Sequence, residues 1–201
     1  RSLGYPLFLT LFSSELPTEQ SLYLVTLVQA VLGTLTVLLA FLLFRTWLSE
    51  WLAVTAAMLT ALSPHLVSAG TYVLTETLFC LALTALALVA SRLTGRSTFV
   101  HLLVLGVVLG CSTLIRPSLQ YFLPVLSVLI LFQFGWRTGT RMTAVVALGF
   151  VLIFAPWIAR NVNSLGQSTD PQLTTNFLHH GMYPDFTYRD VAESYGFPYS
   201  F

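Results

Sequence analysis

Residues 22–44 read LYLVTLVQAVLGTLTVLLAFLLF, and this stretch decides the fold class. It carries no charged residue and is long enough to cross the hydrocarbon core of a bilayer, which takes about 20 mostly apolar residues in a helix. The sequence therefore predicts a membrane-spanning helix here. Gln29 is the one amide side chain in the stretch. A polar residue of this kind usually makes a hydrogen bond to another helix.

Further apolar stretches follow along the chain, so the first is not a single anchor on a soluble domain. With the first stretch they are residues 22–44, 51–68, 72–91, 98–115, 117–134 and 142–159. Only 8% of the residues are charged, against about 25% in soluble domains, and 56% are hydrophobic. We therefore expect an all-α integral membrane protein with about six transmembrane helices. Residues 5–16 are apolar but too short to span, which predicts a short helix in the membrane interface.

The change in composition along the chain predicts three regions. Residues 1–20 form an interfacial segment at the outer face, and residues 21–160 form the transmembrane helical region. Residues 161–201 are rich in Asn, Asp, Gly and Pro with aromatic residues between them, which indicates an extramembrane loop or the start of a further region. The chain begins at Arg1 without a methionine, so we expect an N-terminally truncated fragment of a longer polypeptide.

Arginines mark alternate connections between the predicted helices. Arg45 follows the first helix, Arg92 and Arg96 follow the third, and Arg137 and Arg141 follow the fifth. Basic residues concentrate on the cytoplasmic side of membrane proteins, so these connections are expected to be cytoplasmic. The prediction is a multi-pass protein of the plasma (inner) membrane whose active face is periplasmic or extracellular.

This topology collects polar side chains at the outer level, and they are the candidates for binding substrate or phosphate. They are Arg1, Tyr5, Tyr72, Glu76, Arg116 and Arg160. Arg116 joins two apolar helices without a polar loop, so it reaches lipid headgroups, binds an anion, or pairs with an acid such as Glu76. Tyr72 and Glu76 are four residues apart and are expected to share a helix face. Glu76 also suits a helix N-terminus, and Arg160 also suits a headgroup anchor.

Other motifs narrow the classes of function. Gly106 and Gly110 form a GxxxG pair, which predicts close helix packing and no chemistry. There is no phosphate-binding loop, dinucleotide fingerprint, HExxH or GxSxG motif, so no cofactor is predicted. The adjacent His179 and His180 lack a third ligand at a defined spacing, and no metal site is predicted. A net charge of +1 with scattered arginines gives no case for nucleic acid.

Four motifs in order resemble the bacterial membrane glycosyltransferases of the C-type fold, which include the protein O-mannosyltransferase and aminoarabinose transferase relatives. Residues 1–8, RSLGYPLF, resemble the R-x-x-G-Y-P-L-F stretch of this group. ALSP at 61–64 with LTETLF at 74–79 is similar, as is the G-x-x-x-L-x-R-P pattern at 110–117. PWIARN at 156–161 matches P-W-x-x-R-N. The resemblance covers residues 1 to about 166.

The resemblance implies a C-type bundle and an inverting transferase. Its donor is a sugar on a polyprenyl-phosphate carrier, and its acceptor is a protein, a lipid or a glycan. In the family a carboxylate acts as base on the acceptor hydroxyl and basic residues hold the phosphate leaving group. The family's acidic catalytic residue would precede Arg1, so the base is expected upstream of this chain. Glu76 is then expected to support substrate or structure.

Two other classes compete with the transferase. A transporter or flippase-like carrier would show internal repeats or broken helices at mid-membrane, whereas the polar residues here gather at one face. A non-catalytic scaffold subunit is the third class, in which the outer arginines all reach headgroups.

Overall fold

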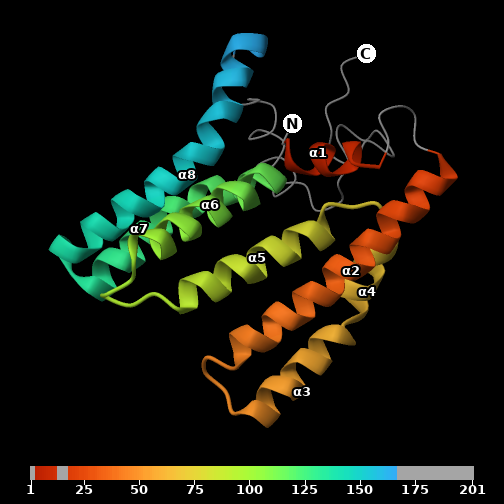
Figure 1. Ribbon diagram of the computed structural model, residues 1–201, viewed down its shortest axis with the longest axis horizontal. Helices are drawn as coiled ribbons and strands as arrows, with labels where there is room; N and C mark the ends of the chain where they lie inside the picture. Colours follow the sequence, from red (N-terminus) through yellow and green to blue (C-terminus); the bar gives the residue numbers. More distant parts are fainter. Residues whose placement is uncertain (1–2, 13–17, 167–201) are drawn as a thin grey trace, which may run out of the picture. The chain divides into compact units, whose positions relative to one another are not determined.

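The computed structural model describes residues 3–12 and 18–166, and all regular secondary structure in these ranges is helical. The chain divides into two compact units, Ser2–Pro156 and a second that holds the residues from Trp157 onward. In chain order, the described elements are α1 (Gly4–Thr10), α2 (Glu19–Phe44), α3 (Glu50–Ala61), α4 (Pro64–Thr71), α5 (Glu76–Ser91), α6 (Phe99–Ile115), the 3-10 helix η1 (Pro117–Tyr121), α7 (Phe122–Phe134) and α8 (Trp136–Leu165) (Figure 1).

Length and composition confirm membrane-spanning helices, though not all six of the predicted ones. Within the described ranges, α2, the η1–α7 stretch and α8 are long and apolar enough to cross a membrane. The α3–α4 pair, bent by 46°, adds a fourth if it is one span. The α5 and α6 helices have 16 and 17 residues, which is short of the usual span. The chain is an integral membrane protein, and crossings at α5 and α6 remain a prediction.

Several local signals set the helix boundaries. Thr18 and Ser21 form a capping box at the start of α2. Pro64 opens α4, because a proline at the first helical position loses no hydrogen bond. The predicted start of the last helix at Met142 is wrong, because Gly135 alone makes the turn with φ 76° and α8 begins at Trp136. Arg137 and Arg141 therefore lie in the first turns of α8 and not in a loop.

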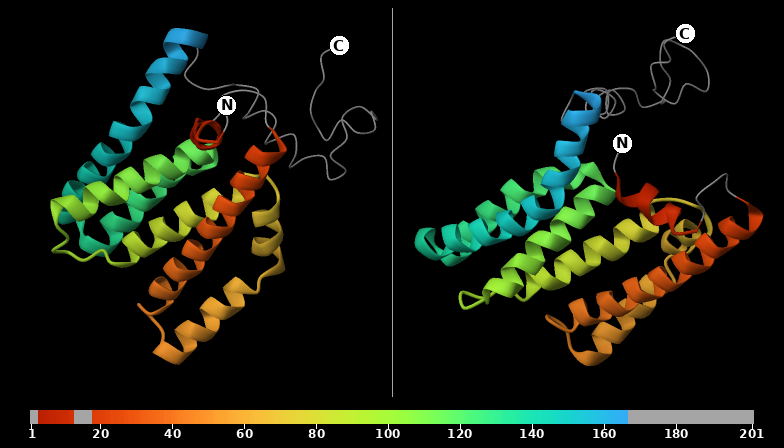
Figure 2. Two further views of the ribbon diagram at one scale, coloured as in Figure 1. Left: turned by 45° about the vertical axis from the view of Figure 1, so that its right-hand side comes forward. Right: turned by 45° about the horizontal axis from the view of Figure 1, so that its top comes forward.

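Within the Ser2–Pro156 unit, α2 packs against α5, with α3 and α4 on α2 and α6 on α5 (Figures 1 and 2). The connections α2–α3, α5–α6 and α7–α8 lie at one end of this unit, and α1 lies at the other end beside the end of α6. The arginine-bearing connections thus share an end, as the alternation of arginines predicts.

The predicted close packing at the GxxxG pair is confirmed. A Cβ added at Gly106 would collide with the carbonyl oxygen of Val146, and one at Gly110 would come within 2.9 Å of Ile153 Cβ. Gly149 faces Gly106 from the other side, and its added Cβ would collide with the carbonyl oxygen of Leu103. These glycines let α6 and the first part of α8 approach backbone to backbone.

Candidate functional site

Arg116 is held in a rigid turn at the end of α6. Pro117 disfavours a helical conformation in the residue before it, and Arg116 is extended with φ −136° and ψ 106°. Its N–H still donates to the Ser112 carbonyl at 2.9 Å, and its carbonyl accepts from Leu119 N–H at 3.1 Å. The backbone that carries the exposed guanidinium is therefore fixed from both sides.

The Arg116 side chain lies over an aromatic ring of α5. Its guanidinium carbon is 5.1 Å from the centre of the Phe79 ring, within the range of a cation–π interaction. The predicted alternative of an ion pair with Glu76 is not realised, since Arg116 and Glu76 form no ion pair in the described ranges. Phe79 follows Glu76 by three residues on α5, so the Arg116 guanidinium lies about one helical turn from Glu76.

Glu76 is the first residue of α5 and is half-buried. Its position suits a carboxylate, because the N-terminal end of a helix carries partial positive charge. The Thr75 hydroxyl donates to Glu76 Oε2 at 3.4 Å. The expectation that Tyr72 shares a helix face with Glu76 is wrong. Tyr72 ends α4 in an extended conformation, with φ −102° and ψ 149°, and its side chain is 64% exposed.

Tyr5 lies on α1 and is buried. The apolar composition of residues 5–16 does not by itself predict this burial. Gly4 makes this possible, since a Cβ there would lie 2.9 Å from the Leu114 and Ile115 backbone. The α1 helix thus rests on the last turn of α6, directly before Arg116. Burial raises the pKa of the Tyr5 phenol, a hydrogen bond from Gln29 lowers it, and the charge of Glu76 raises it.

Gln29 links these segments. Its Nε2 donates to the Leu74 carbonyl at 2.9 Å and to the Tyr5 hydroxyl at 3.3 Å. The predicted interhelical hydrogen bond of Gln29 is therefore confirmed. Leu74 lies two residues before Glu76, so the Tyr5 hydroxyl lies beside the start of α5.

The structure thus brings three of the predicted candidates to one end of the Ser2–Pro156 unit: Tyr5, Glu76 and Arg116. We call these three residues the outer cluster, after the face that the arginine pattern predicts for this end. Tyr72 is on the connection next to it. Arg160 is an exposed residue of α8 in the second unit, and Arg1 lies outside the described residues. Sequence reasoning missed Phe79, although its spacing from Glu76 on a helix was a usable signal.

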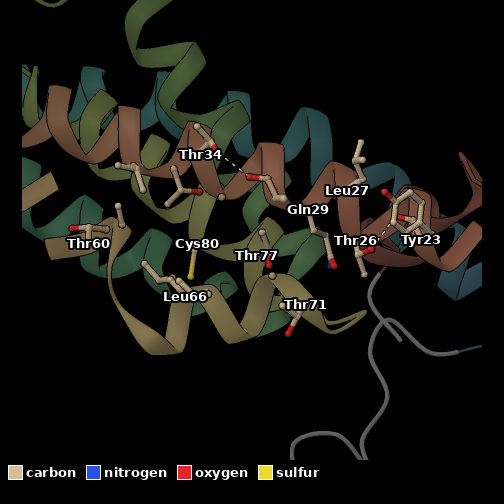
Figure 3. Close-up of a pocket in the computed structure, with 17 residues that line it drawn as sticks. Tyr23, Thr26, Leu27, Gln29, Thr34, Thr60, Leu66, Thr71, Thr77 and Cys80 are labelled. Carbon is tan, nitrogen blue, oxygen red and sulfur yellow. Dashed lines mark hydrogen bonds between the residues drawn. The ribbon is translucent and has the colours of Figure 1, made fainter. Parts of the chain in front are cut away.

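A cavity of about 690 Å³ lies on α2, between this helix and the α3–α4 and α5 helices (Figure 3). Leu27, Gly33, Val37, Leu66 and Cys80 contribute to its wall. Each of the threonines that line it already donates its hydroxyl to a backbone carbonyl: Thr26, Thr34, Thr36, Thr60, Thr71 and Thr77. Tyr23 and Gln29 are the other polar lining residues. With the threonine donors used, the wall is mostly apolar and suits an apolar chain better than a sugar.

Comparison with known proteins gives one family. The sequence model of the dolichyl-phosphate-mannose-protein mannosyltransferase family matches residues 4–159, which contain the outer cluster and the cavity. Neither a curated protein nor a solved structure gives a significant match.

Proposed function

Because the chain belongs to the dolichyl-phosphate-mannose-protein mannosyltransferase family, we propose that it takes part in moving a sugar from a polyprenyl-phosphate carrier to an acceptor at the outer membrane face. Family membership makes it a membrane glycosyltransferase of the mannosyltransferase type. The donor, the face and the residue roles are our proposal. The acceptor is a protein, a lipid or a glycan.

The observation that carries the proposal is Arg116. In the part of the chain that the structure describes, this guanidinium has no acidic partner, is exposed, and lies where the apolar helix α6 meets the apolar η1–α7 stretch. An arginine in this setting can donate two hydrogen bonds to a phosphate oxygen pair. As the bond from the anomeric carbon to the phosphate oxygen breaks, negative charge grows on the leaving phosphate, and Arg116 would stabilise it.

The other members of the outer cluster suit the sugar end of the donor. In the proposed inverting reaction the acceptor oxygen attacks the anomeric carbon, and its proton passes to a base. We assign Glu76 and Tyr5 to binding the sugar or the acceptor by hydrogen bonds, and we leave the base unassigned. Tyr72, Arg1 and Arg160 remain further candidates for contacts with the donor.

The cavity suits the carrier. A polyprenyl chain has to stay in an apolar environment while its phosphate reaches the interface. Cys80 in the cavity wall is the residue after Phe79, which stacks on Arg116. We therefore place part of the isoprenoid chain in this cavity and the phosphate at Arg116.

A transporter is the second class that the sequence left open, and the family match favours the transferase over it.

The proposed orientation in the membrane rests on the arginines at the opposite end of the unit, which predict a cytoplasmic location for that end. Thr94 and Thr138 are exposed, and cysteines introduced at these two positions should then be inaccessible to a membrane-impermeant thiol reagent added from the periplasm.

The test is turnover by the full-length protein in proteoliposomes that contain radiolabelled polyprenyl-phosphate mannose. We expect release of mannose from the carrier, and about a 100-fold lower rate for Arg116→Ala with unchanged thermal stability. Unchanged turnover in Arg116→Ala would contradict a phosphate-binding role for Arg116 and favour a contact with lipid headgroups. No turnover of any polyprenyl-phosphate sugar by the wild type would refute the proposed function.

A further inference from the structure

The Gln29 side chain makes two hydrogen bonds, whereas a single contact between two helices needs only one. It lies in the apolar run of α2 with 0% of its side chain exposed. Both hydrogens of its Nε2 are used, one on the Leu74 carbonyl before α5 and one on the Tyr5 hydroxyl of α1. One amide therefore ties three separate segments together at the level of the outer cluster.

The chemistry of these partners fixes which way the amide points. The Leu74 carbonyl is only an acceptor, so the atom that faces it has to be Nε2 and not Oε1. The same nitrogen then donates to Tyr5, and the Tyr5 oxygen accepts. A phenol has one donor hydrogen and two acceptor sites, so the Tyr5 hydrogen stays available for a different partner.

The position of Tyr5 decides where that hydrogen can be used. Gly4 seats α1 against Leu114 and Ile115, immediately before Arg116. Leu74, on the other side of Gln29, immediately precedes Thr75 and Glu76. The Tyr5 hydroxyl thus lies between the segments that carry the other two members of the outer cluster.

We propose that Gln29 is a positioning residue of the transferase site: by donating to the Tyr5 oxygen it makes the Tyr5 hydroxyl a hydrogen-bond donor for the sugar or the acceptor. The inference rests on the proposed function and adds to it a residue that acts through Tyr5. It also specifies the direction of the Tyr5 hydrogen bond, which runs from Tyr5 to an oxygen of the sugar or of the acceptor.

Thr113 shows what a merely structural polar residue of a helix looks like. It is also buried, and its hydroxyl donates to the Leu109 carbonyl within α6. Gln29 leaves its Oε1 buried without a partner among the described residues, which costs free energy. An apolar residue would pack α2 without that cost, so the amide is better explained by what its nitrogen positions.

Gln29→Glu is the sharpest variant, since it keeps the shape and reverses the hydrogen bond. The buried carboxyl group that replaces the amide stays protonated, and its one hydrogen goes to the Leu74 carbonyl, which can only accept. Its oxygen then accepts from Tyr5, and the Tyr5 hydrogen is withdrawn from the substrate. We expect kcat for mannose release to fall roughly 10- to 100-fold with little change in the KM of the donor. Tyr5→Phe should cause a similar loss, and the double variant should be no worse than either single variant.

Gln29→Met and Thr113→Val serve as controls for packing, since Thr113 does not line the cavity. Gln29→Met keeps the volume and leaves Tyr5 unpositioned, so it should lose about 10-fold in kcat. Thr113→Val should match the wild type. A Gln29→Glu protein within twofold of the wild type, a Tyr5→Phe protein with full kcat, or additive losses in the double variant would overturn the positioning role.

A second readout separates this inference from the proposed function. Fluorotyrosine incorporated at Tyr5 of the full-length protein reports its own hydrogen bond through its fluorine NMR shift. We expect the shift to change in Gln29→Glu and Gln29→Met and to stay constant in Thr113→Val. If the wild type turns over no donor, the proposed function fails while this result still stands. An unchanged shift in Gln29→Glu overturns the inference even in an active enzyme.

Discussion

The α6–α8 pair and the junction of α1, α2 and α5 lie in the same helical unit but are held by different forces. Between α6 and α8, glycines at 106, 110 and 149 allow backbone contact, and the pair depends on shape. At the junction, Gln29 connects Tyr5 and Leu74 by hydrogen bonds. Shape therefore holds the first region together, and we propose that the hydrogen bonds of the second arrange groups for a ligand.

The largest expected effect comes from a substitution in the contact between α6 and α8, which depends on shape. Gly106→Ala places a Cβ against the Val146 carbonyl oxygen, and this neighbour is backbone that cannot rotate away. We expect a loss of about 3 kcal/mol in the free energy of unfolding, measured by denaturation in mixed micelles.

Gly33→Ala is the matched control for that loss. Gly33 lies on α2, where an added Cβ meets nothing within 4 Å. The same substitution should leave the protein as stable as the wild type or slightly more stable, because alanine favours a helix over glycine. Equal losses at both positions would contradict the packing account of α6 and α8.

A second prediction concerns the cavity beside the junction. Gly33→Leu extends a side chain into the space that we assign to the isoprenoid chain. The KM for a long-chain donor should rise about 10-fold, which corresponds to about 1.4 kcal/mol, while a donor with a one- or two-unit chain is unaffected. Val31→Leu, an exposed change on the same helix, is the control. The same rise for both chain lengths would place the carrier elsewhere.

The smallest effect lies in the titration of Tyr5. The charge of Glu76 raises the Tyr5 pKa and the hydrogen bond from Gln29 lowers it. A negative neighbour disfavours the phenolate, so Glu76→Gln should lower the Tyr5 pKa. Gln29→Met removes a donor that stabilises the phenolate and should raise it. A fluorine NMR titration of fluorotyrosine at Tyr5 measures both pKa changes. An unchanged Tyr5 pKa in Glu76→Gln would contradict the electrostatic interaction between Glu76 and Tyr5.

The sequence predicted the parts of this comparison that depend on local pattern. Three features could be predicted in this way. They are the apolar run 22–44, the regular spacing of the GxxxG pair, and the role of Gln29, which is the one amide in that apolar run. The turn at Arg116 follows from Pro117 by local sterics.

Other features depend on tertiary contacts and were missed or misplaced. The stacking of Arg116 on Phe79 joins two helices whose relative rotation no sequence pattern gives. The prediction that Tyr72 and Glu76 share a helix failed because the residues between them are mostly apolar and look like part of the helix. In the structure the chain is extended at Tyr72, and the Leu74 carbonyl accepts a hydrogen bond from Gln29. The start of α8 was set too late, because Arg137 and Arg141 resemble a polar loop although their long side chains allow them to lie on a helix.

We propose that the outer cluster holds the phosphate of a lipid carrier through Arg116. Arg45 provides a matched control, since it is also an exposed arginine over a phenylalanine ring, 5.6 Å from the centre of Phe41, at the opposite end of the unit. The measurement is the dissociation constant of polyprenyl phosphate for the full-length protein in nanodiscs. We predict that Arg116→Ala weakens binding at least about 10-fold and that Arg45→Ala leaves it unchanged. Equal affinities for Arg116→Ala and the wild type would contradict the account.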